Sequence, residues 1–266
     1  MDGTVFFSMI SLLFEPKFNS EIAGAYVKQW LHFFPYLGLF YIIMVFGGQK
    51  VMKSRKAFDL SNFVFVWNLG FSIYSGISTY KIFPDILKVL NSHGIEGTYC
   101  HVDDYYSSQV MGYWAYIFLI SKTFEFGDTL LLVLRKKPVI FMHWYHHLLT
   151  NYITVLSYTR YVAWPRLSIF MNVVVHTIMY FYFATSAKGI KYPNIVRKFI
   201  TSIQLIQFAI SLGFFSHITI KIISGDDANC EISYDSHFLG LAMYLSYLYL
   251  FGRFFYKSYI AKVKKN

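Results

Sequence analysis

The chain has 266 residues, of which 56% are hydrophobic and 21% aromatic, whereas only 14% are charged. This composition excludes an ordinary water-soluble domain of this length and indicates a multi-span membrane protein. The formal net charge of +10 at neutral pH does not indicate nucleic-acid binding, because the basic residues gather at the ends of apolar stretches.

Seven apolar stretches are long enough to cross a bilayer, which takes about 20 residues as a helix. We predict an all-α protein in which these stretches form seven transmembrane helices of one membrane domain, residues 1–266. Pro35 lies inside the first stretch and is expected to kink it. The stretches are 30–48, 60–83, 109–134, 138–158, 166–187, 199–223 and 237–256.

The basic residues between these stretches set the predicted orientation. They gather in clusters that follow the first, third, fifth and seventh stretches. Because basic loops stay on the cytosolic side, we predict that residues 1–29 face the lumen and that residues 257–266 form a cytosolic tail. The clusters are Lys50, Lys53, Arg55 and Lys56; Arg135, Lys136 and Lys137; Lys188, Lys191, Arg197 and Lys198; and Arg253, Lys257, Lys262, Lys264 and Lys265.

Both cysteines of the chain, Cys100 and Cys230, fall on the lumenal side of this topology. That side is oxidising in the secretory pathway, so we favour a disulfide between them over two free thiols. The bond would tie the connection after the second stretch to the connection before the seventh.

The tail carries lysines three and five places from its end, Lys264 and Lys262. This spacing resembles a dilysine retrieval signal for the endoplasmic reticulum, which is read only on a cytosolic tail. A basic tail that merely anchors the last helix at the membrane surface is the alternative.

Polar and ionisable residues concentrate inside four of the apolar stretches. Ionisable groups are costly at membrane depth and usually mark a functional site. The third and fourth stretches contribute charged and imidazole groups, and the fifth and sixth add amides, a further histidine and a tyrosine. The candidates are Lys122, Glu125, Asp128 and Thr129; His143, His146 and His147; Asn172, His176 and Tyr180; and Gln204 and Gln207.

These positions predict one shared interior site near the cytosolic surface. At 3.6 residues per turn, His143, His146 and His147 lie within about a 100° arc of one helix face. His146 lies eight residues beyond Pro138, which puts it about 12 Å below the cytosolic end of its helix. A substrate with a polar head in the cytosol and a long apolar tail, such as an acyl-CoA, fits this depth.

Each of these features also has a purely structural interpretation. Lys122 and Glu125 are spaced to form a simple ion pair, although Asp128 then lacks a partner on its own helix. Gln204 and Gln207 are the kind of amides that hold membrane helices together. A single buried histidine is usually a packed core residue, but three on one helix face favour a functional site.

Four motifs give the chain a resemblance to a known family. They read KxxExxDT from Lys122, HxxHH from His143, HxxMYxY from His176 and TxxQxxQ from Thr201. In this order they resemble the very-long-chain fatty acid elongase family, the condensing enzymes of the endoplasmic reticulum. The Trp-Tyr pair inside the histidine box resembles the branch that extends palmitoyl chains. Phe183 departs from the pattern, since many members have a tyrosine there.

The resemblance implies a barrel of six helices around a substrate tunnel, with the remaining helix outside. It implies condensation of acyl-CoA with malonyl-CoA to 3-oxoacyl-CoA, CO2 and CoA. It also implies an enzyme without metal or other cofactor that works beside the reductase and dehydratase of an elongation cycle in the endoplasmic reticulum membrane. A homodimer is a candidate assembly.

The residues suit this chemistry. Neutral imidazole attacks a thioester and then leaves, so we expect His146 to carry the acyl group. Donors fixed around the enolate of malonyl-CoA would stabilise its charge. The expected roles are proton acceptor or orienting group for His143 and His147, enolate donor for Asn172, His176 and Gln204, histidine support for Glu125 and Asp128, charge balance for Lys122, and substrate contact for Tyr180 and Gln207.

Two other protein classes share part of this pattern. Membrane di-iron desaturases use HxxHH boxes, but they carry several, whereas only four of the nine histidines here fall near the predicted site. A seven-span receptor shares the orientation and an external disulfide, but the Asp-Arg-Tyr and Asn-Pro-X-X-Tyr sequences of such receptors are absent. Condensation is therefore the favoured function.

Overall fold

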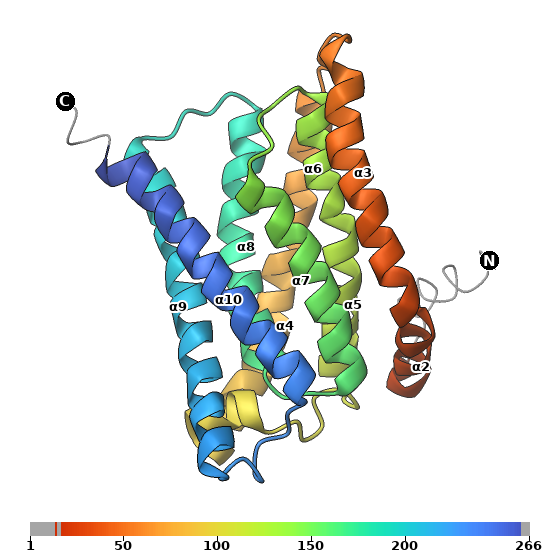
Figure 1. Ribbon diagram of the computed structural model, residues 1–266, viewed down its shortest axis with the longest axis vertical. Helices are drawn as coiled ribbons and strands as arrows, with labels where there is room; N and C mark the ends of the chain where they lie inside the picture. The colour runs from red at the N-terminus through yellow and green to blue at the C-terminus, as the bar shows by residue number, and fades with distance from the viewer. Residues whose placement is uncertain (1–13, 15–16, 262–266) are drawn as a thin grey trace.

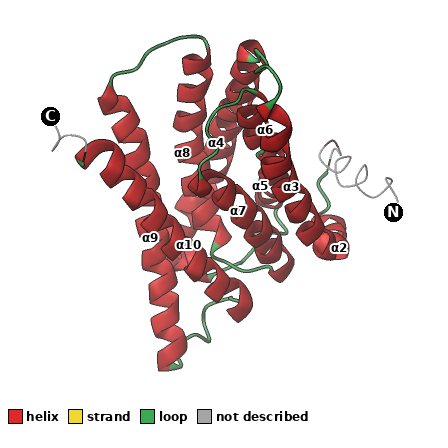
Figure 2. Ribbon diagram, turned by 45° about the horizontal axis from the view of Figure 1, so that its top comes forward, coloured by secondary structure: helices red, strands yellow, loops and turns green. Residues whose placement is uncertain are grey.

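A computed structural model describes residue 14 and residues 17–261. In this part of the chain helices are joined by loops, and there is no strand (Figures 1 and 2). The predicted all-α class is therefore confirmed for the described residues. The retrieval signal predicted at Lys262 and Lys264 lies outside them, as does most of the N-terminal segment before residue 17.

The first helical segment begins earlier than predicted, and a 3-10 turn interrupts it just before Pro35. It begins with α2, Ser20–Trp30, whose first turn is capped by the Asn19 side chain through the backbone N–H groups of Glu21 and Ile22. A 3-10 turn, Leu31–Phe33, leads into α3, Phe34–Lys53. Pro35 lies in the first turn of α3, where its missing N–H has no intrahelical acceptor to lose.

The second helix, α4, runs over Ser61–Cys100 and so continues well past the predicted end at residue 83. Pro84 lies inside it, and the packing of α4 along α8 sustains the helix across the one backbone hydrogen bond that a proline removes. The helix bends at Gly94, whose φ of +67° is open to glycine.

The third predicted stretch is broken in two by the structure. The helix α5, Met111–Phe124, ends one residue before Glu125, and α6, Phe126–Leu134, begins one residue after it. Asp128 N–H bonds to the Glu125 carbonyl at 3.1 Å, an i to i+3 contact that tightens the backbone at this point. Lys122 and Asp128 therefore lie on opposite sides of a helix break at Glu125.

The remaining helices follow their predicted stretches closely. They are α7, Phe141–Arg160; α8, Pro165–Ala187; α9, Asn194–Ser224; and α10, Tyr234–Phe255, which continues as a π-helical turn, Tyr256–Ile260. Gly225 ends α9 in the left-handed conformation, with φ of +73°, as helix C-termini commonly require.

The helices lie side by side along the long axis of the molecule (Figure 1). Their contacts run from α4 to α5, α7, α10, α9 and α8 and return from α8 to α4. Helices α2 and α3 lie at the edge of this cycle, where α2 contacts α5 and α7 and α3 contacts α6 and α7. Connections after α3, α6 and α8 lie at the upper end in Figure 1, and those after α4, α7 and α9 lie at the lower end.

Four helical segments among the described residues are long and apolar enough to cross a membrane, judged by length and composition. They are Ser20–Lys53, Pro165–Ala187, Asn194–Ser224 and Tyr234–Ile260. The break at Glu125 leaves α5 and α6 with 14 and 9 residues, too short to qualify separately. The three histidines of α7 and the asparagines, serines and tyrosines in the first half of α4 lower the hydropathy of those helices. Each predicted stretch is helical among the described residues, although the first and third are divided, and seven membrane crossings stay a prediction.

The lower end of the bundle is tied together by covalent and polar contacts. Cys100, at the end of α4, forms a disulfide with Cys230, 130 residues later, as the sequence led us to favour. Beside it Glu231 N–H bonds to the Cys100 carbonyl at 2.8 Å. The fully buried Arg166 donates to Asp85 at 3.0 Å and to the Val102 carbonyl at 2.8 Å. These contacts close this end of the bundle.

Candidate active site

A cavity of about 600 Å³ lies among α4, α6, α7, α8, α9 and α10. It reaches the upper end of the bundle, where Arg135 and Arg197 line it beside the ends of α6 and α9. Nine of the predicted site residues line it, brought together from four helices. They are Asp128 on α6; His143, His146 and His147 on α7; Asn172, His176 and Tyr180 on α8; and Gln204 and Gln207 on α9.

Lys122 and Glu125 lie behind the cavity wall and form a buried ion pair. The Lys122 Nζ donates to Glu125 Oε1 at 2.7 Å and to Asn172 Oδ1 at 2.9 Å. The two residues are 2% and 1% exposed. A buried ion pair is stable only when further hydrogen bonds satisfy its remaining groups. The amide of Asn172 supplies one, which also fixes its own orientation.

Glu125 connects this ion pair to two histidines on different helices. Its Oε2 lies 3.6 Å from His147 Nδ1, and its Oε1 lies 3.6 Å from His176 Nδ1. On the opposite side of the His176 ring, Nε2 lies 3.2 Å from the amide nitrogen of Asn172. The break between α5 and α6 places Glu125 where one carboxylate faces both imidazoles. Its predicted association with the histidines therefore matches the geometry.

Asp128 has other partners than the histidines. Its Oδ1 accepts from Trp67 Nε1 at 2.6 Å, and its Oδ2 accepts from Tyr180 OH at 2.7 Å. Trp67 reaches the carboxylate because Gly127 has no side chain, since a Cβ there would lie 2.6 Å from the indole ring. Trp67, which lies on α4, 61 residues from Asp128, was not among the predicted site residues.

His143 is held by a chain of hydrogen bonds that reaches α3. Its Nε2 lies 3.0 Å from Thr129 Oγ1, and that hydroxyl lies 2.7 Å from Tyr41 OH. Tyr41 is 1% exposed and stacks on Phe126 with ring centroids 4.0 Å apart. The outer helix therefore helps to orient the first histidine of the box. No sequence signal marked Tyr41 among the many tyrosines of the chain.

His146 is the histidine of the box whose ring has no polar partner in the part of the chain that the structure describes. It is partly exposed, as is His143, whereas His147 is buried. Its ring lies 4.8 Å from that of Tyr247 and 6.4 Å from that of Phe208, measured between centroids. Among the described residues, no side chain forms a hydrogen bond with its ring, while its backbone carbonyl accepts from Tyr247 OH at 3.0 Å. Its ring nitrogens are therefore available to a ligand.

The two glutamines of α9 form the wall opposite the histidines. Gln204 donates from Nε2 to the sulfur of Met179 at 3.1 Å, a weak contact. Gln207 is 5% exposed and lines the same cavity. One turn toward the upper end, Thr201 lies 3.3 Å from Tyr259 OH of the last helical turn. This wall offers amide groups to the cavity.

The other histidines of the described residues lie away from the cavity. His93 stacks on His101, with ring centroids 4.7 Å apart. His217 contacts Tyr99 OH at 3.1 Å, and His237 contacts Thr219 at 2.9 Å. Across residue 14 and residues 17–261, no three His, Cys, Asp or Glu side chains are arranged to hold a metal ion.

Comparison with known proteins gives a consistent result. The GNS1/SUR4 family, also called ELO, matches residues 26–266. The long chain fatty acid elongase 2 of Caenorhabditis elegans is 47% identical over 222 residues, which cover 84% of this chain and 81% of that protein. The very long chain fatty acid elongase 6 of Drosophila melanogaster is 36% identical, over 88% of this chain and 74% of its own length.

The match to a human relative covers almost the whole length of both proteins. The very long chain fatty acid elongase 3 of Homo sapiens is 31% identical over 259 residues, or 96% of this chain and 94% of its own length. The family match spans all four of the motifs that line or support the cavity. The chain therefore belongs to the ELO family of fatty acid elongases.

Proposed function

We propose that this protein condenses acyl-CoA with malonyl-CoA to 3-oxoacyl-CoA, CO2 and CoA. The observation that carries the proposal is the convergence of the histidine box, His176, the amides and Asp128 on one cavity. The names of its relatives as fatty acid elongases agree with a lipid-extending enzyme. The resemblance of the histidine box to the palmitoyl-elongating branch makes long saturated acyl chains the first substrates to test.

His146 is the proposed nucleophile. An imidazole nitrogen attacks the thioester carbonyl, the C–S bond breaks, and CoA leaves as the thiol once it has taken a proton. His146 suits this step better than its neighbours because its ring lines the cavity and, unlike theirs, has no polar side-chain partner among the described residues. His143 is bonded to Thr129, and His147 faces Glu125. These two histidines orient the box and accept the proton that the attack releases.

The second step uses the donors on α8 and α9. Malonyl-CoA loses CO2, and the resulting enolate attacks the acyl carbon as the C–N bond to His146 breaks. Asn172, His176 and Gln204 are the proposed donors to the enolate oxygen. Lys122 contributes indirectly, because its bond to Asn172 Oδ1 turns the amide nitrogen of Asn172 toward His176. An interior cavity also protects the acyl-imidazole from hydrolysis.

The proposed setting is a seven-span protein of the endoplasmic reticulum membrane with a lumenal N-terminus and a cytosolic C-terminus. Three of the predicted basic clusters lie in connections at the upper end of Figure 1, and the disulfide joins connections at the lower end. The closed cycle of helix contacts supports a six-helix barrel with α2 and α3 outside. We place the CoA phosphates near Arg135 and Arg197 and the acyl tail toward the lower end.

We propose that the reaction needs no metal or other cofactor. The reductase and dehydratase of an elongation cycle are the proposed functional partners. A homodimer is part of the proposal only as a candidate assembly. The alternative enzyme class, a di-iron desaturase, would make an unsaturated product without consuming malonyl-CoA. A seven-span receptor would make no product.

The test is an incubation of purified protein with labelled malonyl-CoA and a ladder of saturated acyl-CoAs. We expect a 3-oxoacyl-CoA product two carbons longer than the substrate. His146→Ala should abolish it, whereas His93→Ala, at an exposed histidine of the lower end, should keep it. Absence of labelled product with every chain length would refute the proposed function.

A further inference from the structure

A second, smaller cavity of about 50 Å³ lies between the first and the closed end of the bundle. It lies among α5, α7, α8 and α10. Asn172 lines both cavities, so the two share a wall. Trp164 and Ser168 precede Asn172 by eight and four residues, which is about 12 and 6 Å along α8. An acyl chain that starts at the histidines and points down the bundle would end here.

Packed side chains fill the closed end of the bundle beyond this cavity. The ring of Trp164 packs on Phe215, with centroids 5.1 Å apart. Tyr106 OH donates to the Val162 carbonyl at 2.9 Å, which holds the loop before α8 against the connection after α4. The disulfide and the contacts of Arg166 lie at the same end. A chain terminus that reaches this cavity therefore contacts its lining side chains.

The lining is unexpectedly polar for the end of an alkyl chain. Hydroxyl groups of Thr150, Thr154 and Ser157 recur at helical spacing along one face of α7. Two of these are satisfied, since Thr150 lies 2.7 Å from Tyr247 OH and Ser157 donates to the Ile153 carbonyl at 2.7 Å. These hydroxyls need nothing from a ligand.

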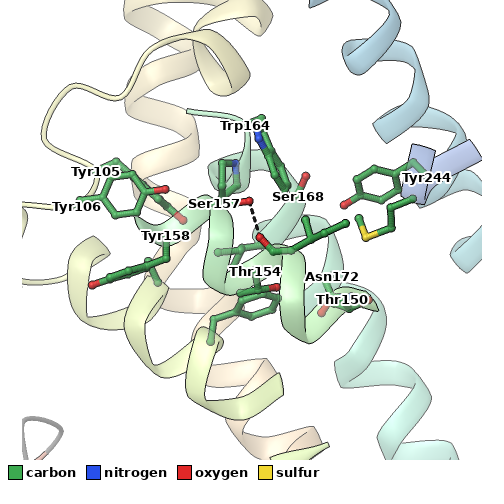
Figure 3. A pocket seen from close by; sticks show the side chains of 16 residues that line it. Tyr105, Tyr106, Thr150, Thr154, Ser157, Tyr158, Trp164, Ser168, Asn172 and Tyr244 are labelled. Carbon is green, nitrogen blue, oxygen red and sulfur yellow. Dashed lines mark hydrogen bonds between the residues drawn. The ribbon is translucent and has the colours of Figure 1, made fainter. Parts of the chain in front are cut away.

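Three other polar atoms of the lining have no hydrogen bond that meets the distance and angle limits among the described residues, and they are Tyr158 OH, Trp164 Nε1 and Ser168 Oγ. Ser168 faces the Tyr244 hydroxyl, whereas no described residue faces the indole N–H of Trp164. The Trp164 and Ser168 side chains are 4% and 6% exposed. Figure 3 shows Trp164, Ser168 and Tyr244 converging at one end of the pocket, with Thr150 and Asn172 at the other. The indole N–H can only donate, so what satisfies it must bring an acceptor, such as an oxygen.

A methyl-ended chain cannot supply that oxygen. A space of about 50 Å³ holds a few water molecules, since a cavity needs about 10–15 Å³ to hold one water molecule. A methyl terminus that enters displaces this water and leaves the Trp164 indole donor unsatisfied, which is unfavourable. A terminal hydroxyl replaces the water and restores the acceptor.

We propose that this small cavity is the distal end of the acyl site and that it selects acyl chains bearing a hydroxyl near their terminal carbon over equally long chains that end in methyl. Unmodified chains stop short of the Trp164 indole, so the polarity of this end limits their length. This inference rests on the proposed condensing activity and adds to it a substrate class and two specificity-determining residues.

The test compares acyl-CoAs of equal length with and without a terminal hydroxyl, each with malonyl-CoA and the full-length protein. At the longest saturated length that the protein extends, kcat/KM for the hydroxylated substrate should be higher by about 5- to 150-fold, which corresponds to one unsatisfied buried group. At lengths too short to reach the cavity the two substrates should be extended alike.

Variants distinguish an effect of the polar atoms from an effect of the size of the cavity. Ser168→Ala removes one oxygen from the lining, and Trp164→Phe removes the indole donor; each should reduce the preference for the hydroxyl and allow longer methyl-ended chains. Ser75→Ala is the matched control, because Ser75 Oγ is also buried without a partner but does not line the cavity. Its length profile should equal that of the wild type.

The outcomes are distinguishable. If the wild type makes product but shows no hydroxyl preference at any length, this inference is wrong and the condensing activity stands. An unchanged length profile in both Ser168→Ala and Trp164→Phe would equally overturn it. A cavity that limits chain length by its size alone would not respond to the loss of one polar atom. If the wild type makes no product from any acyl-CoA, the proposed function fails and this inference fails with it.

Discussion

Replacement of Gly127 by alanine should disturb the support of Asp128. A Cβ at this position would lie 2.6 and 2.9 Å from two ring carbons of Trp67. Contacts this short do not occur, so the indole ring or α6 has to move. The indole Nε1 is also the 2.6 Å donor to Asp128, whose other oxygen holds Tyr180 in the cavity wall. The clash therefore acts on the site as well as on packing.

The magnitude depends on whether the indole keeps its hydrogen bond. If the ring shifts and still reaches Asp128, only overpacking remains, at about 1–3 kcal/mol. If the ring leaves, the lost hydrogen bond to a charged group adds about 1.5–3 kcal/mol. We therefore expect Gly127→Ala to cost between about 1 and 6 kcal/mol of stability. Gly70→Ala on α4 is the control, because a Cβ there meets nothing within 4 Å.

The assay is the apparent unfolding temperature of the purified protein in detergent, together with the condensation rate. Gly127→Ala should lower both, and Gly70→Ala should lower neither. The double variant Gly127→Ala with Trp67→Phe should lose less than the sum of the two single changes, because the smaller ring removes the clash. If Gly127→Ala is as stable and as active as Gly70→Ala, the reasoning about the indole and Asp128 is wrong.

Three further predictions concern other parts of the molecule. Cys100→Ser should lower the unfolding temperature by an amount that reflects about 2–5 kcal/mol, since the disulfide closes a loop of 130 residues; Cys230→Ser should match it, and a neutral effect would argue against a structural bond. Tyr41→Phe should lower kcat by about 2- to 12-fold with little change in KM, because one hydrogen bond that orients the histidine box through Thr129 is lost; a change confined to KM would contradict this. Strong chelators should leave the condensation rate unchanged, and loss of activity that iron or zinc restores would contradict a metal-free site.

The residues proposed to carry the chemistry were predictable because residues of their types are rare inside apolar stretches. Histidines, carboxylates and amides inside apolar stretches stand out, since such groups are costly in a membrane unless they face an interior. Helical periodicity then placed His143, His146 and His147 on one face, and the structure brings them to the cavity with the polar residues of α8 and α9. The helical segments were predictable from apolar length alone.

The residues that support the chemistry were not predictable from the sequence. Trp67 and Tyr41 lie 61 and 88 residues from their partners, and aromatic residues make up 21% of the chain, so neither position stands out. Asp128 was predicted to support a histidine, but its carboxylate accepts from Trp67 and Tyr180. The helix break at Glu125 was also not predicted.

Helix ends were the least predictable feature of the fold. Hydropathy ended the second stretch at residue 83, where Pro84 and Asp85 begin a more polar segment. The structure continues α4 through Pro84 to the kink at Gly94, and α8 packs along it while Arg166 pairs with Asp85. Those contacts join residues 81 positions apart, which no local pattern records.

The covalent role of His146 is the central claim, and the release of free CoA from acyl-CoA in the absence of malonyl-CoA tests it most directly. A nucleophilic His146 predicts one equivalent of CoA for each active site and an acyl mass on the peptide that carries the histidine box. His146→Ala should abolish both. If the wild-type protein releases no CoA until malonyl-CoA is added, and the kinetics show a ternary complex, the acyl-imidazole is wrong and His146 acts at most as a base.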